Sequence, residues 1–196
     1  MKSFALAAAA LVGLVASVSA QDAPTQSAPF HLKIKSANET LDGVGLSSCH
    51  AGAAIEALCV SPGPGVGEYY LNSTAGNSWL GWNLPLSTGN IPSSLKWSQH
   101  LSSNLAVPLF FPGDDRDLNA GFDEHEKLYL LDWYDETKAV AMQRPESQQT
   151  KYYNWHVCWT WAGGYWYQVL AWVTFGEPVN PTCVKVDVVR EFVAPY

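Results

Sequence analysis

Apolar and polar residues alternate in short segments along most of the chain, and helical periodicity is scarce. In FHLKIKS, residues 30–36, the side chains of Phe30, Leu32 and Ile34 fall on one face of a predicted strand, and an Asp-Gly turn, LDGV, follows. Residues 50–60, HAGAAIEALCV, fit either a short helix or a strand. Further strands are predicted for the segments EYYLN, SWLGWNL, SLKWSQ, VPLFF, KLYLLDW, KAVAMQ and TCVKVDVV.

About ten strands at short spacing, without alternating helices, predict an all-β fold. We expect an antiparallel β-sandwich, either jelly-roll-like or barrel-like, stapled by disulfides. The chain shows no threefold or blade-like repeat, and no linker is long enough to divide it. Residues 21–196 are therefore predicted to form one domain.

The N-terminus has the three parts of a secretory signal peptide. Lys2 supplies a positive charge, residues 4–15 are apolar, and SVSA offers small residues for cleavage after Ala20. The apolar stretch is too short and too rich in alanine to be preferred as a membrane anchor. We therefore expect residues 1–20 to be removed and the mature protein to be soluble outside the cell.

Charge disfavours two classes of partner. Removal of residues 1–20 takes away Lys2 and no acidic residue, which changes the net charge from −7 to about −8. An acidic chain without a basic run lacks the electrostatic surface that nucleic acids or anionic lipids require. No cofactor is predicted either, since the glycine-rich SPGPGVG lacks the lysine and helix of a phosphate-binding loop.

Four cysteines, an even number in an exported chain, predict two disulfides. Three pairings are possible, and we favour Cys49–Cys59 and Cys158–Cys183 because each pair is local. Zinc binding is the competing use of these residues, but their spacing fits no usual zinc pattern. Two sequons, at Asn38 and Asn72, are candidate glycosylation sites in an exported protein.

Residues 153–173, YNWHVCWTWAGGYWYQVLAWV, contain five of the nine tryptophans. If Gly163-Gly164 forms a two-residue hairpin turn, Trp161 faces Trp166 and Trp155 faces Trp172. Because side chains alternate between the faces of a strand, all five tryptophans then share one face of the hairpin.

This face has two interpretations. Exposed aromatic rings are typical of sugar-binding surfaces, whereas the aliphatic pair in the middle of the face, Val157 and Leu170, favours core packing. We expect a buried stripe that is exposed only near the turn. The candidate ligand-binding residues are therefore Trp161 and Trp166, together with Tyr165 at the turn.

Residues 115–126, DRDLNAGFDEHE, resemble a calcium-binding loop in their spacing of Asp115, Asp117, Asn119, Asp123 and Glu126. The expected glycine is displaced by one position and no flanking helices are evident, so an acidic, turn-rich loop is the favoured interpretation. We therefore predict no metal site.

The chain contains acidic residues that are candidates for a pair of catalytic carboxylates in hydrolysis, but nearly any acidic protein contains as many. A serine nucleophile is disfavoured because the chain contains no G-x-S-x-G, and the histidines form no metal-binding group. No catalytic residue is predicted. The acidic candidates are Asp123, Glu124, Asp132, Asp135 and Glu136.

Several segments together resemble an uncharacterised family of small secreted proteins from filamentous fungi: PFHLKIKSANETLDGVGLSSCHAGAAIEALC, YYLN, WHVCWTW, VLAWV and NPTCVKVDVV. The resemblance covers most of the predicted mature chain. It implies a secreted, mainly β domain stapled by Cys158 and Cys183. The family has no established activity, so the resemblance assigns no catalytic or binding residue.

Three functions are consistent with these features. The leading hypothesis is a secreted, non-catalytic protein that binds cell-wall polysaccharide or another glycan through exposed aromatic residues. The alternatives are a secreted glycan-active hydrolase that uses paired carboxylates, and a structural or host-interacting protein whose partner is another extracellular protein.

Overall fold

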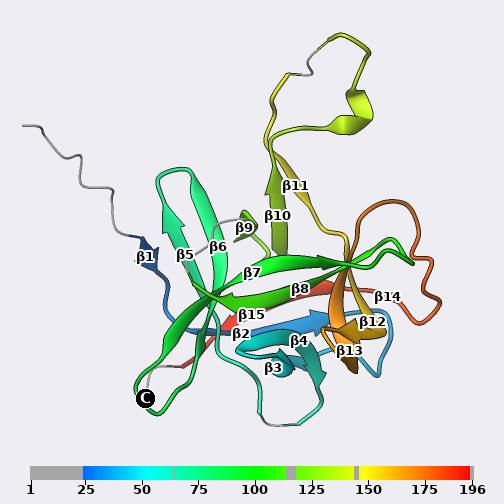
Figure 1. The fold of residues 1–196 in the computed structure, drawn as a ribbon. Coiled ribbons are helices and arrows are strands. Elements are labelled where there is room, and N and C mark those ends of the chain that lie inside the picture. Colours follow the sequence, from blue (N-terminus) through cyan, green and yellow to red (C-terminus); the bar gives the residue numbers. More distant parts are fainter. Residues whose placement is uncertain (1–23, 64, 114–117, 144–145, 195–196) are drawn as a thin grey trace, which may run out of the picture.

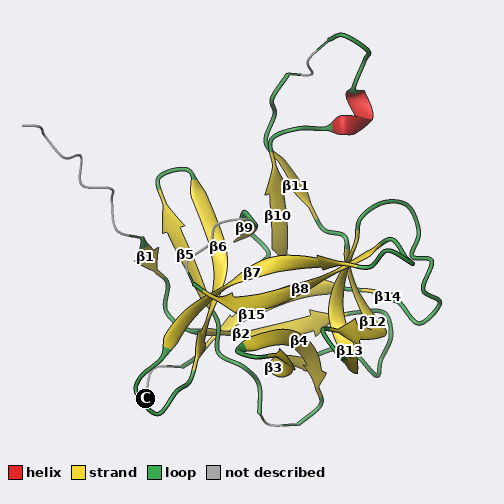
Figure 2. Cartoon of the chain, in the orientation of Figure 1, coloured by secondary structure: helices red, strands yellow, loops and turns green. Residues whose placement is uncertain are grey.

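A computed structural model describes residues 24–63, 65–113, 118–143 and 146–194 of the chain. These residues form strands and one short 3-10 helix, with no α-helix among them (Figure 2). The predicted signal peptide lies outside the described residues. The first eight strands are β1 Thr25–Gln26, β2 Phe30–Lys35, β3 Gly45–Gly52, β4 Ile55–Ser61, β5 Tyr70–Thr74, β6 Asn77–Leu84, β7 Ile91–Gln99 and β8 Leu105–Pro112. They are followed by β9 Ala120–Phe122, β10 Leu128–Asp132, the 3-10 helix η1 Glu136–Lys138, β11 Thr150–Tyr152, β12 Trp155–Ala162, β13 Tyr165–Val173, β14 Val184–Lys185 and β15 Asp187–Phe192.

The strands form two sheets, and every pairing between strands is antiparallel. The large sheet has the strand order β1-β5-β6-β7-β8-β13-β4-β3-β2-β15, with β12 paired to β13 and β14. The small sheet has the order β11-β10-β9. Figure 1 shows β10 and β11 extending away from the large sheet, with their connecting loop farthest out.

The large sheet folds over a common core. Phe30 in β2 and Trp82 in β6 come from distant positions in the strand order, yet both belong to the main buried cluster. A bridge between Phe30 and Tyr69, just before β5, brings the two ends of the sheet together. The predicted sandwich-like antiparallel architecture is therefore confirmed.

The alternating segments fold as their pattern predicts. In β2 the apolar side chains are buried and the intervening ones lie nearer the surface. Near the C-terminus, Val186 and Val188 are buried, although Val186 interrupts the predicted strand and separates β14 from β15. The Asp-Gly turn lies in a nine-residue connection between β2 and β3, residues 36–44, where Gly43 has φ +77°.

For two segments, the pattern of apolar and polar residues did not determine the structure. Residues 50–60 form strand rather than helix, as β3 and β4 joined by a two-residue turn, and their alanines Ala51 and Ala57 fit into a second, smaller core cluster. The strand predicted for KAVAMQ, residues 138–143, is wrong. This segment lies in the loop between β10 and β11, where no described strand pairs with it, and Val140 and Met142 are exposed.

Both predicted disulfides are present. Cys49–Cys59 links β3 to β4, and Cys158–Cys183 links β12 to the residues before β14. The described residues contain no free cysteine. Cys158 is completely buried, on the face of the hairpin opposite the tryptophans.

Candidate functional site

The aromatic hairpin has the predicted register. In the β12–β13 ladder, Trp155 lies opposite Trp172 and Trp161 lies opposite Trp166. Gly163 and Gly164 form the turn, and Gly163 has φ +58°. A positive φ at the first central residue is typical of the tight hairpin turns that match the twist of the strands.

Burial divides the tryptophan face into two parts, as predicted. Trp155 and Trp172 are 1% and 9% exposed, whereas Trp161 and Trp166 near the turn are 52% and 51% exposed. Trp159, two residues before Trp161, is also exposed at 44%. The sequence interpretation did not include Trp159 among the candidates, although its position in the alternation places it on the same face.

Tyr165 does not belong to this surface. It pairs with Ala162 and therefore lies on the opposite face of the hairpin from Trp161 and Trp166. Its ring stacks on Tyr167 at 5.8 Å and contacts His50 edge to face at 5.1 Å. The structure thus brings two of the three candidate residues together and separates the third from them.

Trp161 and Trp166 line a shallow cavity of about 250 Å³, which we call the tip pocket. Their ring centroids are 5.6 Å apart and the ring planes are inclined at 68°. The two indoles therefore form a corner rather than a flat platform. The remaining wall of the tip pocket consists of polar and small side chains, most of them from two loops: His100, Ser102, Ser103, Thr160, Val179 and Asn180.

Hydrogen bonds hold residues 179–183 against the edge of β12. Asn180 Nδ2 donates to the Trp159 carbonyl oxygen at 2.9 Å, and the Trp159 backbone N–H donates to Thr182 Oγ1 at 3.0 Å. The Cys158–Cys183 disulfide fastens the same segment to β12. These loop residues are remote in sequence, so no local pattern predicted that they would complete the site.

His100 supplies a polar atom without a protein partner. Its Nε2 is buried and forms no hydrogen bond within the part of the chain that the structure describes. Buried polar atoms almost always have a hydrogen-bond partner, from protein or from water. The tip pocket therefore combines two exposed indole faces with hydrogen-bonding groups, and its described lining contains no lysine, arginine, aspartate or glutamate.

A family model for a domain of unknown function, DUF7907, matches residues 27–192. The chain belongs to the DUF7907 family. This confirms the resemblance to an uncharacterised family, and the fungal origin stays a prediction. Comparisons with curated proteins and with solved structures gave no match.

The acidic candidates of this DUF7907 domain lie in two separate places. Asp123 lies in the turn before β10, where its carboxylate accepts hydrogen bonds from the backbone of Lys127, whereas Asp132 ends β10. Five residues of extended chain separate Lys127 from Asp132, which corresponds to about 17 Å. Glycosidase carboxylates lie only about 5–9.5 Å apart, so these two cannot act as a pair.

Asp132, Asp135 and Glu136 do line a common cavity. However, Asp135 caps η1, and hydrogen bonds from Thr137 together with Lys138 lower its pKa. A general acid in glycoside hydrolysis needs the opposite shift. Asp135 is therefore unsuited to the role of general acid.

The calcium-loop spacing does not produce a described metal site. Asp115 and Asp117 lie outside the described residues. The remaining positions have protein partners: Asn119 accepts from the Ser78 N–H, and Glu126 pairs with Arg190. Among the described residues, no three His, Cys, Asp or Glu side chains are placed to hold a metal ion.

Asp123, another position of the spacing, also has protein partners. Burial would raise its pKa, but backbone N–H groups of Lys127 and His125 and the Tyr153 hydroxyl donate to its carboxylate and lower it. Burial of Tyr153, together with its hydrogen bond to Asp123, raises the pKa of Tyr153 to about 12. His125 is exposed in this turn, and His156 is a buried strand residue.

The two sequons differ in their surroundings. Asn38 lies exposed in the loop between β2 and β3, where its Oδ1 accepts hydrogen bonds from Thr40. Asn72 lies within β5, partly buried, and its Oδ1 accepts from Gln26 Nε2 at 3.0 Å. Its Nδ2 faces Gly81 on β6, where an added Cβ would lie only 2.7 Å away. Asn38 is therefore the more accessible sequon.

The described residues contain no helix long and apolar enough to span a membrane.

Proposed function

We propose that this DUF7907 domain is an exported, non-catalytic protein that binds a neutral glycan in the tip pocket. The observation that carries the proposal is the pair of half-exposed indoles, Trp161 and Trp166, at the wall of a cavity whose other side chains are small or polar. Most large aromatic side chains in a small β-protein are needed for its core, so their exposure at one end of the stripe suggests a ligand.

The chemistry of the tip pocket suits a sugar. The C–H faces of a pyranose ring pack on indole rings, while its hydroxyl groups require donors and acceptors around the edge. Ser102 and Ser103 offer hydroxyl groups, and His100 Nε2 lacks a partner among the described residues. Sugar hydroxyl groups can hydrogen-bond to these serine side chains, whereas His100 Nε2 is too buried to be reached without a shift of its neighbours.

The angle between the indoles favours one form of glycan. A crystalline polysaccharide presents a flat surface, which calls for coplanar rings. Rings inclined at 68° form a corner, and a corner can contact two sides of a single chain. We therefore expect soluble oligosaccharides or free chain ends to bind in preference to crystalline cellulose or chitin.

Export supports the choice of a glycan partner. Both disulfides are of the kind that persists in an oxidising compartment, and the predicted signal peptide would deliver the domain there. Cell-wall polysaccharides and glycoproteins are abundant in that compartment.

Binding to a glycan array, followed by calorimetry with the best ligand, tests the proposal. The double variant Trp161→Ala, Trp166→Ala should bind at least about tenfold more weakly, because truncating a contacting aromatic side chain costs about 2 kcal/mol or more at a binding hot spot. Tyr165→Ala is the matched control. It removes an aromatic ring from the same hairpin tip but from the opposite face, so its affinity should be unchanged.

Two results would contradict the proposal. The first is a folded protein that binds no glycan on the array. The second is a double variant with unchanged affinity, which would place the binding site elsewhere.

A further inference from the structure

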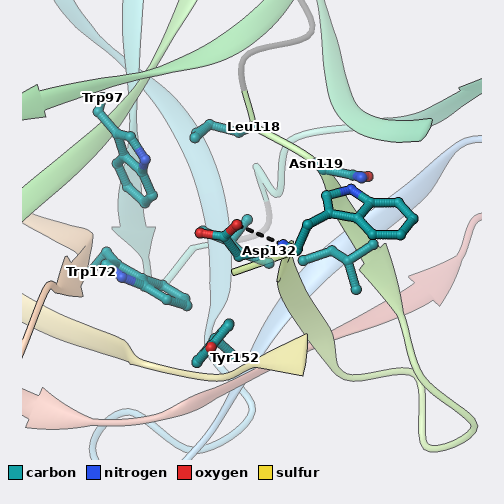
Figure 3. A pocket seen from close by; sticks show the side chains of 9 residues that line it. Trp97, Leu118, Asn119, Asp132, Tyr152 and Trp172 are labelled. Carbon is teal, nitrogen blue, oxygen red and sulfur yellow. Dashed lines mark hydrogen bonds between the residues drawn. The ribbon is translucent and has the colours of Figure 1, made fainter. Parts of the chain in front are cut away.

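A second cavity, of about 420 Å³, lies between the two sheets, and we call it the aromatic groove. Trp97 of β7 and Trp172 of β13 line it from the large sheet, and Tyr152 of β11 lines it from the small sheet. Asp132 at the end of β10 and the following residue, Trp133, also line the groove. Figure 3 shows Asp132 projecting into the groove, with Trp97 and Trp172 on one side of its carboxylate.

Packing fixes the tryptophan wall. The ring centroids of Trp97 and Trp172 are 6.0 Å apart, and both rings also contact Trp155. Trp155 is fully buried, and its Nε1 donates a hydrogen bond to the Leu128 carbonyl oxygen at 2.9 Å. These ring contacts place the two indoles together at the wall of the groove.

Hydrogen bonds fix the carboxylate as well. Asp132 Oδ1 accepts from the backbone N–H groups of Trp133 at 2.6 Å and Tyr134 at 3.2 Å. The second oxygen points toward Trp97 and Trp172 (Figure 3). No lysine, arginine or histidine in the described ranges forms an ion pair with Asp132.

Among the described residues, the surroundings of the groove carry acidic side chains. An adjoining cavity of about 460 Å³ shares Asp132, Tyr152 and Trp172 with the groove and adds Asp135 and Glu136. Neither cavity has a lysine or arginine among its described lining residues. Of these acids Asp135 is partly neutralised by Lys138, at 3.0 Å.

The geometry points to a binding site for a small organic cation, specifically an alkylated ammonium group. The faces of tryptophan and tyrosine rings carry partial negative charge and attract such a cation, and a nearby carboxylate adds a full charge. The apolar alkyl groups on the nitrogen pack against the indoles, which an inorganic cation cannot do. Trp97, Trp172, Tyr152 and the exposed Trp133 supply the rings, and Asp132 supplies the charge.

Other ligand classes fit the groove less well. A divalent metal ion needs several oxygen ligands, whereas Asp132 is the only acidic residue in the described lining of this cavity. An anion would be repelled. A neutral sugar needs several free hydrogen-bonding groups, and the Asn119 amide is already hydrogen-bonded to Ser78 and Asn77.

Choline is the probe for this site, compared with its uncharged analogue in which a tert-butyl group replaces trimethylammonium. Calorimetry or chemical-shift titration at millimolar concentrations should show that choline binds and that the analogue binds at least about tenfold more weakly. Asp132→Asn should weaken choline binding about 10- to 100-fold, because it removes the charge. An asparagine Oδ1 still accepts from both backbone N–H groups, so this variant retains the local fold.

Two further variants separate the groove from the tip pocket. Trp133→Ala, which removes an exposed indole at the groove, should weaken choline binding and leave glycan binding unchanged. The double variant Trp161→Ala, Trp166→Ala should have the reverse effect. A failure of the groove proposal is therefore distinguishable from a failure of the tip-pocket proposal.

Three results would overturn the inference: equal binding of choline and the uncharged analogue, unchanged choline binding in Asp132→Asn, or a neutral oligosaccharide that loses affinity in Trp133→Ala while choline does not bind. If choline binds as expected, phosphatidylcholine vesicles and a trimethyl-lysine peptide identify the source. Retention on vesicles would indicate a lipid headgroup, and binding of the peptide would indicate a modified protein.

Discussion

Gly163 places the exposed tryptophans by allowing the hairpin tip to approach β3. Its φ of +58° lies in the left-handed region, and a Cβ built at this position would lie 1.8 Å from the Ala51 carbonyl oxygen. Gly164, the neighbouring residue in the same turn, has nothing within 4 Å of such a Cβ. The two glycines therefore have different roles although they are adjacent in sequence.

Gly163→Ala should lower the free energy of unfolding by about 2 kcal/mol or more, because alanine is strained at positive φ and its Cβ collides with backbone atoms. In a domain of this size the melting temperature would fall by about 4–8 °C. Thermal and denaturant unfolding measure both quantities. Gly164→Ala is the control and should change stability by less than about 0.5 kcal/mol. Equal effects of the two substitutions would contradict the tight approach of the turn to Ala51.

At the scale of the elements, the segment formed by residues 174–183 positions part of the tip pocket. This segment is anchored at one end by Asn104, which donates to the Phe175 and Glu177 carbonyl oxygens, and at the other by Cys183. Between these anchors it contributes Asn180 to the tip pocket. The other disulfide, Cys49–Cys59, instead joins two strands that are already paired along most of their length.

Removal of the two disulfides should therefore have different consequences. Replacing Cys158 and Cys183 with alanine should increase hydrogen exchange in residues 179–183 and weaken glycan binding. Replacing Cys49 and Cys59 with alanine should lower stability by a comparable amount, about 3 kcal/mol, without changing exchange in that segment. Mass-spectrometric hydrogen exchange on both double variants makes the comparison. Unchanged exchange in residues 179–183 after loss of Cys158–Cys183 would contradict this prediction. It would show that the hydrogen bonds to Trp159 hold the segment in place without the disulfide.

Features that depend on residues close together in the chain were predictable from the sequence. The β12–β13 register follows from the period of a strand and from Gly163-Gly164 in the turn, and both disulfides follow from local pairing. The pattern was wrong for residues 138–143, where alternation occurs without a neighbouring strand to supply hydrogen bonds. Alternation indicates which face of a strand can be buried, but strand formation also needs a partner edge.

The two cavities were not predictable, because each depends on contacts between segments far apart in the chain. His100 and Asn180 meet Trp161 only after the β7–β8 connection and the segment before β14 have folded beside the hairpin. The aromatic groove likewise joins Trp97, Asp132 and Trp172 from three different strands or strand ends. A single sequence shows that these residue types are present but contains no local signal of their proximity.

The molecule as a whole uses one tryptophan face for three purposes. Trp155 is core, Trp161 and Trp166 line the tip pocket, and Trp172 lines the aromatic groove. Trp166 and Trp172 lie on the same face of β13, six residues or about 20 Å apart. The described lining of the groove contains the Asp132 carboxylate and that of the tip pocket contains no acidic residue, so the proposed ligands differ in charge. Because the two sites are separate, a substitution in one site leaves the lining residues of the other unchanged.

The stability of the whole molecule should depend on pH through His156. This side chain is buried in β12, and burial lowers its pKa below the ordinary value of 6.5. The positive charge of Lys185 on β14 lowers it further, against the raising effects of the Asn154 carbonyl oxygen and Glu177. As pH falls below about 6.5, the unfolded chain therefore binds a proton at this position before the folded protein does.

The free energy of unfolding should consequently decrease as pH falls from about 6.5 toward the folded pKa of His156, with a slope of at most about 1.4 kcal/mol per pH unit for one proton. The lowered pKa values of Asp123 and Asp135 act in a separate window, below about pH 4, because their ordinary value is 3.8. Urea unfolding between pH 5 and pH 7.5 should show this slope in the native chain and lose it in His156→Gln. His125→Gln, at an exposed position, should retain it. A slope that persists in His156→Gln would assign the proton uptake to another group and contradict the prediction.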